Sequence, residues 1–184
     1  MSLKSPKLSI TLDSRWLQLE PLRVGAVPRG LGTAARHVTL EDAESRPLLR
    51  VDVYCADSEY FLSEDAQMWR ENLMIGFGHR VHAVEIASRS VTTIELGCYF
   101  CDFYPTDDYL LIASAERVFR MDPDRSLLWR SECLAVDGVI VHDAGPPLVR
   151  GDGECDPPGG WEPFSLDVAN GAVSWPGGRP WLLP

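Results

Sequence analysis

The stretch SLDVANGAVSW, residues 165–175, decides how the rest of the sequence is interpreted. Apolar and polar residues alternate on both sides of Ala-Asn-Gly, and this pattern predicts two strands joined by a tight turn. Two similar units precede it, at residues 73–96 and 109–131, each with a strand, a short link, a strand, a polar turn and a further strand. The stretch is therefore one copy of a unit that recurs approximately three times.

The spacing of the units indicates the architecture. Glu85 and Asp122 are 37 residues apart, and Asp122 and Asp167 are 45 apart. Periods of this length, with four strands each, are typical of propeller blades. The sequence predicts one all-β domain over residues 1–184, with N-terminal strands in 8–62 and three blade-like units in 63–184. We expect an antiparallel meander of propeller-like four-stranded units that forms an incomplete or small propeller.

Four residues of the opening stretch stand at a defined spacing: Ser165, Asp167, Gly171 and Trp175. At these positions the stretch resembles the repeat motif of pyrroloquinoline-quinone-type propeller blades, and Asp122 and Trp129 match a second copy in part. The resemblance implies that the Asp caps the turn, that the Gly supplies a positive φ and that the Trp packs between adjacent blades. No residue matches the quinone or calcium sites of that family, so the resemblance implies no cofactor.

One segment, residues 63–72, could form a short helix. Ser63 is a suitable N-cap, and Glu64 and Asp65 would lie in the first turn, where the helix dipole favours acids. The alternative is that this segment leads directly into the strand that follows. At most one short helix is therefore expected.

The charge balance limits the partners that the protein can have. The net charge is −10, from 27 acidic and 17 basic residues. Nucleic acids and anionic membranes are unfavourable partners for such a chain, whereas a basic protein would be attracted. No apolar stretch approaches the length of a membrane span, and the N-terminus does not have the pattern of a signal peptide. We expect a cytoplasmic protein, and the preference for arginine over lysine suggests a bacterial one.

Three groups of residues are candidates for metal-binding or redox sites. Cys98 and Cys101 have the spacing of a zinc or redox pair, but their aromatic neighbours predict a strand that would place them on opposite faces. His79 and His82 have the same difficulty. The alternating acids of residues 151–156 begin like a calcium loop but lack its later ligands. The sequence therefore predicts no catalytic residue, no metal site and no cofactor.

The C-terminal region contains the candidate binding residues. Residues 151–160 are interpreted as an acidic loop insertion, and Trp161, Trp175 and Trp181 lie close by in the sequence. Exposed Trp beside acids would suit a basic protein partner, because Trp is frequent among residues that dominate binding energy. The candidate residues are Asp152, Glu154, Asp156, Trp161 and Trp175.

These observations favour a non-catalytic protein-binding module, similar to immunity proteins or antitoxins that neutralise a basic partner. One alternative is a small metal- or ligand-dependent enzyme or sensor that gathers Cys, His and Asp side chains at strand ends. Another is a structural subunit of a larger assembly. The sequence names neither the partner nor the oligomeric state.

Overall fold

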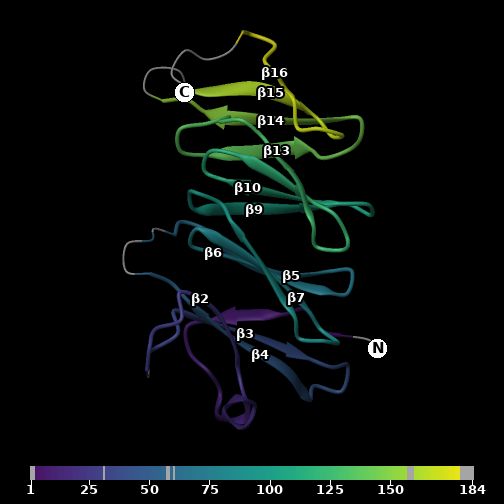
Figure 1. Cartoon of the computed structure of the whole chain (residues 1–184). Coiled ribbons are helices and arrows are strands. Elements are labelled where there is room, and N and C mark those ends of the chain that lie inside the picture. The colour runs from purple at the N-terminus through teal and green to yellow at the C-terminus, as the bar shows by residue number, and fades with distance from the viewer. Residues whose placement is uncertain (1–2, 31, 57–58, 60, 157–159, 179–184) are drawn as a thin grey trace. The chain divides into compact units, whose positions relative to one another are not determined.

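The fold is all-β, as the sequence predicts (Figure 1). The computed structural model describes residues 3–30, 32–56, 59, 61–156 and 160–178. These residues form sixteen strands, which are arranged in four sheets of four, and one short 3₁₀ helix. The chain divides into two compact units, Met1–Glu95 and Leu96–Pro184, and each unit holds two of the sheets.

The first sheet has the strand order β1-β3-β4-β2. Its strands are β1 (Lys7–Ser9), β2 (Leu22–Gly25), β3 (Arg36–Glu41) and β4 (Pro47–Tyr54). The 3₁₀ helix η1 (Ser14–Gln18) lies between β1 and β2 in the sequence. One pairing departs from an antiparallel meander, since β2 runs parallel to β4. The N-terminal strands therefore form a four-stranded sheet of their own, in addition to the three units expected from the repeat.

The second sheet has its strands in sequence order. They are β5 (Glu64–Trp69), β6 (Asn72–Phe77), β7 (Arg80–Glu85) and β8 (Val91–Glu95). The short helix considered for residues 63–72 is wrong, and the alternative of an extended segment is confirmed. All six positions of β5 pair with β6, from Glu64 opposite Phe77 to Trp69 opposite Asn72. The cross-strand pairing overrides the weak capping signal.

The core of the first unit lies between its two sheets. Alternate residues of β3 and β4, such as Val38 and Val51, pack with Leu73, Ile75 and Phe77 of β6. Burying one such side chain contributes roughly 1.5–3 kcal/mol. One face of the first sheet is thus covered by the second sheet.

The second unit contains the third and fourth sheets, coloured from teal to yellow in Figure 1. The third consists of β9 (Phe100–Pro105), β10 (Leu110–Ser114), β11 (Val118–Met121) and β12 (Leu127–Arg130). The fourth consists of β13 (Val139–Asp143), β14 (Leu148–Glu154), β15 (Trp161–Asp167) and β16 (Val173–Ser174). Their common core includes Leu111, Val118, Val149, Phe164 and Leu166.

The turn inside the opening stretch has the predicted construction. Oδ1 of Asp167 accepts a hydrogen bond from the backbone N–H of Ala169 at 2.7 Å. Gly171 has a φ of 73° and donates its N–H to the carbonyl of Asp167. In the second copy, Arg125 has a φ of 69° and donates its N–H to the carbonyl of Asp122, three residues earlier rather than four. Both repeat copies therefore place an Asp and a left-handed residue at the turn.

The first sheet contains a similar turn in the polar segment of residues 42–47. Ser45 has a φ of 67° and donates its N–H to the carbonyl of Asp42, three residues earlier. In the second sheet, Arg89 has a φ of 59° and donates its N–H to the carbonyl of Glu85, four residues earlier. Each of the four sheets thus has an acidic residue followed by a left-handed residue at one turn.

The resemblance predicts that the Trp of each repeat copy, Trp175 and Trp129, packs between blades, and the structure shows this arrangement for Trp129. Its indole N–H donates to the carbonyl of Val168 at 2.8 Å, so it joins the third sheet to the fourth. A Cβ at Gly171 would lie only 2.7 Å from the Trp129 ring, so this turn accepts glycine alone at that position. Trp175, by contrast, lies edge-on against Phe164 of its own sheet at a centroid distance of 6.1 Å. Trp181 lies outside the described residues.

Candidate functional site

The cysteines are poorly suited to nucleophilic or redox chemistry. Cys98 precedes β9 and Cys101 lies within it, and all five cysteines are free thiols. Burial raises the pKa of both thiols, that of Cys101 to about 11. The thiolate is the reactive and metal-binding form, so its population at neutral pH is small. Among the described residues, no three His, Cys, Asp or Glu side chains are grouped to hold a metal ion.

Three histidines have structural partners. His82 is buried in β7, and its Nδ1 lies 2.9 Å from Oγ1 of Thr93. Burial lowers the pKa of His82 to about 4, so this imidazole is neutral at neutral pH. His37 pairs with Asp52 at 2.7 Å, and His142 pairs with Asp152 at 2.8 Å.

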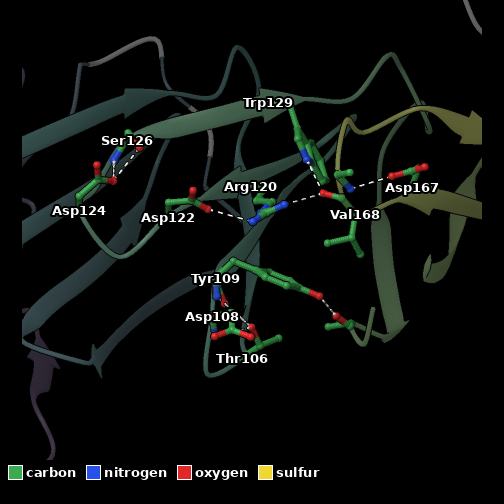
Figure 2. A network of polar contacts seen from close by, with 12 residues as sticks. Thr106, Asp108, Tyr109, Arg120, Asp122, Asp124, Ser126, Trp129, Asp167 and Val168 are labelled. Carbon is green, nitrogen blue, oxygen red and sulfur yellow. Dashed lines mark hydrogen bonds and ion pairs between the residues drawn. The ribbon is translucent and has the colours of Figure 1, made fainter. Parts of the chain in front are cut away.

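A polar network inside the second unit joins its two sheets (Figure 2). Arg120 of β11 donates from Nη1 to the carbonyl of Val168 at 2.8 Å, the carbonyl that also accepts from Trp129. The guanidinium of Arg120 pairs with Asp122 and lies 4.8 Å from the centre of the Tyr109 ring. Among the described residues, Nε of Arg120 and Oδ1 of Asp122 are buried without a hydrogen-bond partner. The bonds from Arg120 and Trp129 to the carbonyl of Val168 connect the two sheets.

The outward face of the first sheet is covered by its own chain. Trp16 of η1 is 3% exposed, and its carbonyl accepts from Arg50. On the same face Asp52 accepts from Nε and Nη2 of Arg50 at 2.9 and 2.8 Å, and from Nδ1 of His37. Glu41 pairs with Arg15 of η1. We call this surface the capped face.

A cleft of about 660 Å³ borders the capped face. Its lining includes Arg23, Arg50, Asp52 and Tyr54. The charges pair among themselves, Arg50 with Asp52, and Arg23 with Glu20 at 3.4 Å. The cleft therefore presents no uncompensated charge that would define the chemistry of a ligand.

The acidic segment of residues 151–156 is largely a strand, which corrects its interpretation as a loop insertion. Residues 151–154 belong to β14 and pair with β15, Asp152 opposite Pro163 and Glu154 opposite Trp161. Gly151 and Gly153 face the core, where a Cβ would lie 2.2 and 2.0 Å from a backbone oxygen. The acids alternate with these glycines and therefore point to the opposite face.

On that opposite face of the fourth sheet three apolar side chains are exposed, and Arg150 and Asp152 of β14 lie between Leu148 and the end of the strand that pairs with Trp161. Trp161 is 48% exposed, Ile140 42% and Leu148 38%. Their neighbours in β13 and β15, such as Val141 and Phe164, are buried in the core on the other side. We call the surface formed by Ile140, His142, Leu148, Arg150, Asp152, Glu154, Trp161 and Pro163 the open face.

The structure brings together three of the five predicted binding residues. Asp152, Glu154 and Trp161 lie on the open face, in β14 and β15. Trp175 lies against Phe164, and hence on the covered side of the sheet. Asp156 is exposed beyond the end of β14. The predicted set is therefore not one surface.

Two neighbours of these residues were missed by the sequence interpretation. Val139 and Val141 of β13 face the core, whereas Ile140 and His142 lie on the opposite side. Because Val139, Ile140 and Val141 are all apolar, the sequence shows no alternation that would place Ile140 on the outward side.

Comparisons with known proteins found similarity among solved structures. No family model matches the sequence, and no curated protein matches it. Among solved structures, the chain is similar to the WD40 domain of Pan2 from Neurospora crassa, at 10% sequence identity and a TM-score of 0.47. The match covers 75% of this chain and 45% of that one, so this chain spans less than half the length of that domain.

The fold bears on the resemblance stated from the sequence. The four-stranded sheets have the composition of propeller blades. The assignment to the pyrroloquinoline-quinone type stays a prediction. Within the described residues, the structure has no helix long and apolar enough to cross a membrane.

Proposed function

We propose that the protein is a non-catalytic protein-binding module and that the open face is its binding surface. The observation that carries the proposal is that Trp161, Ile140 and Leu148 are exposed on one side of a sheet whose other side is buried. Exposed apolar side chains gathered on one rigid element mark an interaction site more often than scattered ones do. A sheet also presents such side chains at defined spacing, which favours specific recognition.

The proposed partner is a basic protein. Asp152 and Glu154 lie between the exposed apolar residues, and the whole chain carries a net charge of −10. Acidic groups at the edge of an apolar surface increase the association rate of a basic partner and select against acidic ones. A role like that of an immunity protein or antitoxin in the bacterial cytoplasm would use such a surface.

The test compares two matched double variants against one purified partner. A candidate partner is first captured with the wild-type protein, purified, and titrated by calorimetry. Ile140→Asp with Leu148→Asp disrupts the open face, whereas Leu127→Asp with Leu128→Asp alters two similarly exposed leucines of β12. We expect the first variant to weaken binding at least tenfold and the second to leave the Kd unchanged.

Two results would contradict the proposal. Unchanged binding by the open-face variant would show that the partner docks elsewhere. An equal loss in both variants would show that binding responds to added charge on the protein as a whole. Circular dichroism of both variants confirms that their folds are retained before the comparison is made.

A further inference from the structure

Three residues form a row across the open face. Glu154 of β14 lies opposite Trp161 of β15. On the other side, the backbone N–H of Glu154 donates to the carbonyl of Gly138, just before β13, at 2.8 Å. The row therefore contains a glycine, a carboxylate and an indole on three adjacent segments of the sheet.

The indole and the carboxylate converge on the glycine. A Cβ built on Gly138 would lie 3.1 Å from Cη2 of Trp161 and 3.3 Å from Oε2 of Glu154. The Trp161 ring thus extends across β14 towards Gly138, and the carboxylate of Glu154 reaches the same place. Because Gly138 has no side chain, the far edge of the ring and the carboxylate remain side by side at the surface.

The carboxylate of Glu154 has no ion pair or side-chain hydrogen bond within the described part of the chain, unlike its neighbours. Asp152 is paired with His142 at 2.8 Å, and Asp143 with Arg150 at 3.1 Å. The bases of this face are therefore engaged by other acids. Trp161 is the most exposed apolar side chain of the open face, at 48%. An unpaired carboxylate thus lies beside an accessible indole.

We infer that this row is a seat for an arginine side chain presented by a protein partner. A cation is attracted to the face of a Trp ring, and a guanidinium is planar, so it can stack on the indole while its edge pairs with a carboxylate. The ammonium of lysine is a compact, strongly hydrated charge that cannot make both contacts with the same geometry. Ile140 and Pro163, one row away, would contact apolar atoms beside the arginine.

This inference rests on the proposed function, since it names the group that the open face recognises. The probe is a short Gly-Ser peptide with one central arginine, compared with the same peptide carrying lysine or citrulline. Citrulline keeps the planar shape of arginine but has no charge. The readout is the indole N–H resonance of Trp161 in a ¹H–¹⁵N spectrum, assigned through Trp161→Phe.

We expect the arginine peptide to shift the Trp161 resonance in a saturable manner, the lysine peptide to bind several-fold more weakly, and the citrulline peptide to cause almost no shift. Glu154→Gln should weaken the arginine peptide at least fivefold. Gly138→Ala should weaken it as well, because the added methyl group enters the seat. Asp152→Asn removes the same charge from the same face one row away and should change binding less than twofold.

Equal binding of the three peptides, or an equal loss in Glu154→Gln and Asp152→Asn, would overturn the seat, since either result indicates general attraction of cations. The two proposals can fail separately. If the double variant of Ile140 and Leu148 releases the purified partner while Glu154→Gln and Gly138→Ala bind it with unchanged Kd, the open face binds protein but the arginine seat is wrong.

Discussion

The capped face of the first sheet and the open face of the last sheet are similar surfaces, but only the capped face is covered by the protein's own chain. Each is the side of a four-stranded sheet turned away from a hydrophobic core, and each carries acidic residues. On the capped face, η1 buries Trp16 and brings Arg15 to Glu41. On the open face, Trp161 stays exposed and the carboxylate of Glu154 has no partner among the described residues. The protein covers one such surface with its own chain and leaves the other accessible.

The difference is also electrostatic. Burial opposes the ionisation of Glu41, but Arg15 and Lys4 outweigh that cost and hold its pKa below the ordinary value. Asp52 is satisfied by Arg50 and His37 in the same way. Buried acids are tolerated only with such partners. A partner protein that covers the open face must therefore supply a cation for Glu154.

The largest predicted difference is between the losses of stability on replacing the buried Trp16 and the exposed Trp161. Trp16→Ala should lower the free energy of unfolding by roughly 3–5 kcal/mol, since it leaves a large cavity under η1. Trp161→Ala should lower it by at most about 1 kcal/mol, because much of that side chain is already in water. Urea unfolding followed by circular dichroism measures both, with equal m-values expected. Equal costs would show that the open face is covered within the protein itself.

The next prediction compares the two paired aspartates. Asp52→Asn should cost about 3 kcal/mol, because it leaves the half-buried guanidinium of Arg50 without its counter-charge. Asp152→Asn removes an exposed partner of His142 and should cost at most about 0.5 kcal/mol. The same unfolding experiment applies. A large cost for Asp152→Asn would mean that its ion pair is desolvated and that the two faces are alike.

The smallest predicted effect is a pH dependence of stability that comes from His82. Since the pKa of His82 falls from 6.5 in the unfolded chain to about 4 when folded, the unfolded state binds more protons between these values. The stability is full above pH 6.5 and declines as the pH falls towards 4. The loss between pH 7.5 and 4.5 should be roughly 2–3 kcal/mol.

A variant of His82 tests this assignment. His82→Gln should flatten the pH dependence of the unfolding free energy over that interval, because its amide does not titrate. If this variant retained the full decline, another group would be responsible for it.

Sequence patterns predicted the strands and turns well and the binding surface incompletely. The turn of Asp167 and Gly171 could be predicted because its residues have dihedral preferences that hold in any context. The helix considered at residues 63–72 failed because the pairing of β5 with β6 outweighs a capping signal. The acids of β14 were interpreted as a loop because Gly and Asp are frequent in loops, although here Gly151 and Gly153 allow close backbone approach.

The sequence by itself determined the strand periodicity, the turn chemistry and the excess of acid, since each depends on residue types and their local order. Only the tertiary structure decided which side of each sheet is covered. Alternation in β14 separates glycines from acids, but the same pattern fits either side facing the core. The packing of Phe164 and Val149 in the core buries one side, and the position of η1 over the first sheet distinguishes the capped face from the open one. Contacts between residues distant in the sequence determine which side of a sheet is buried, and a local sequence pattern does not reveal these contacts.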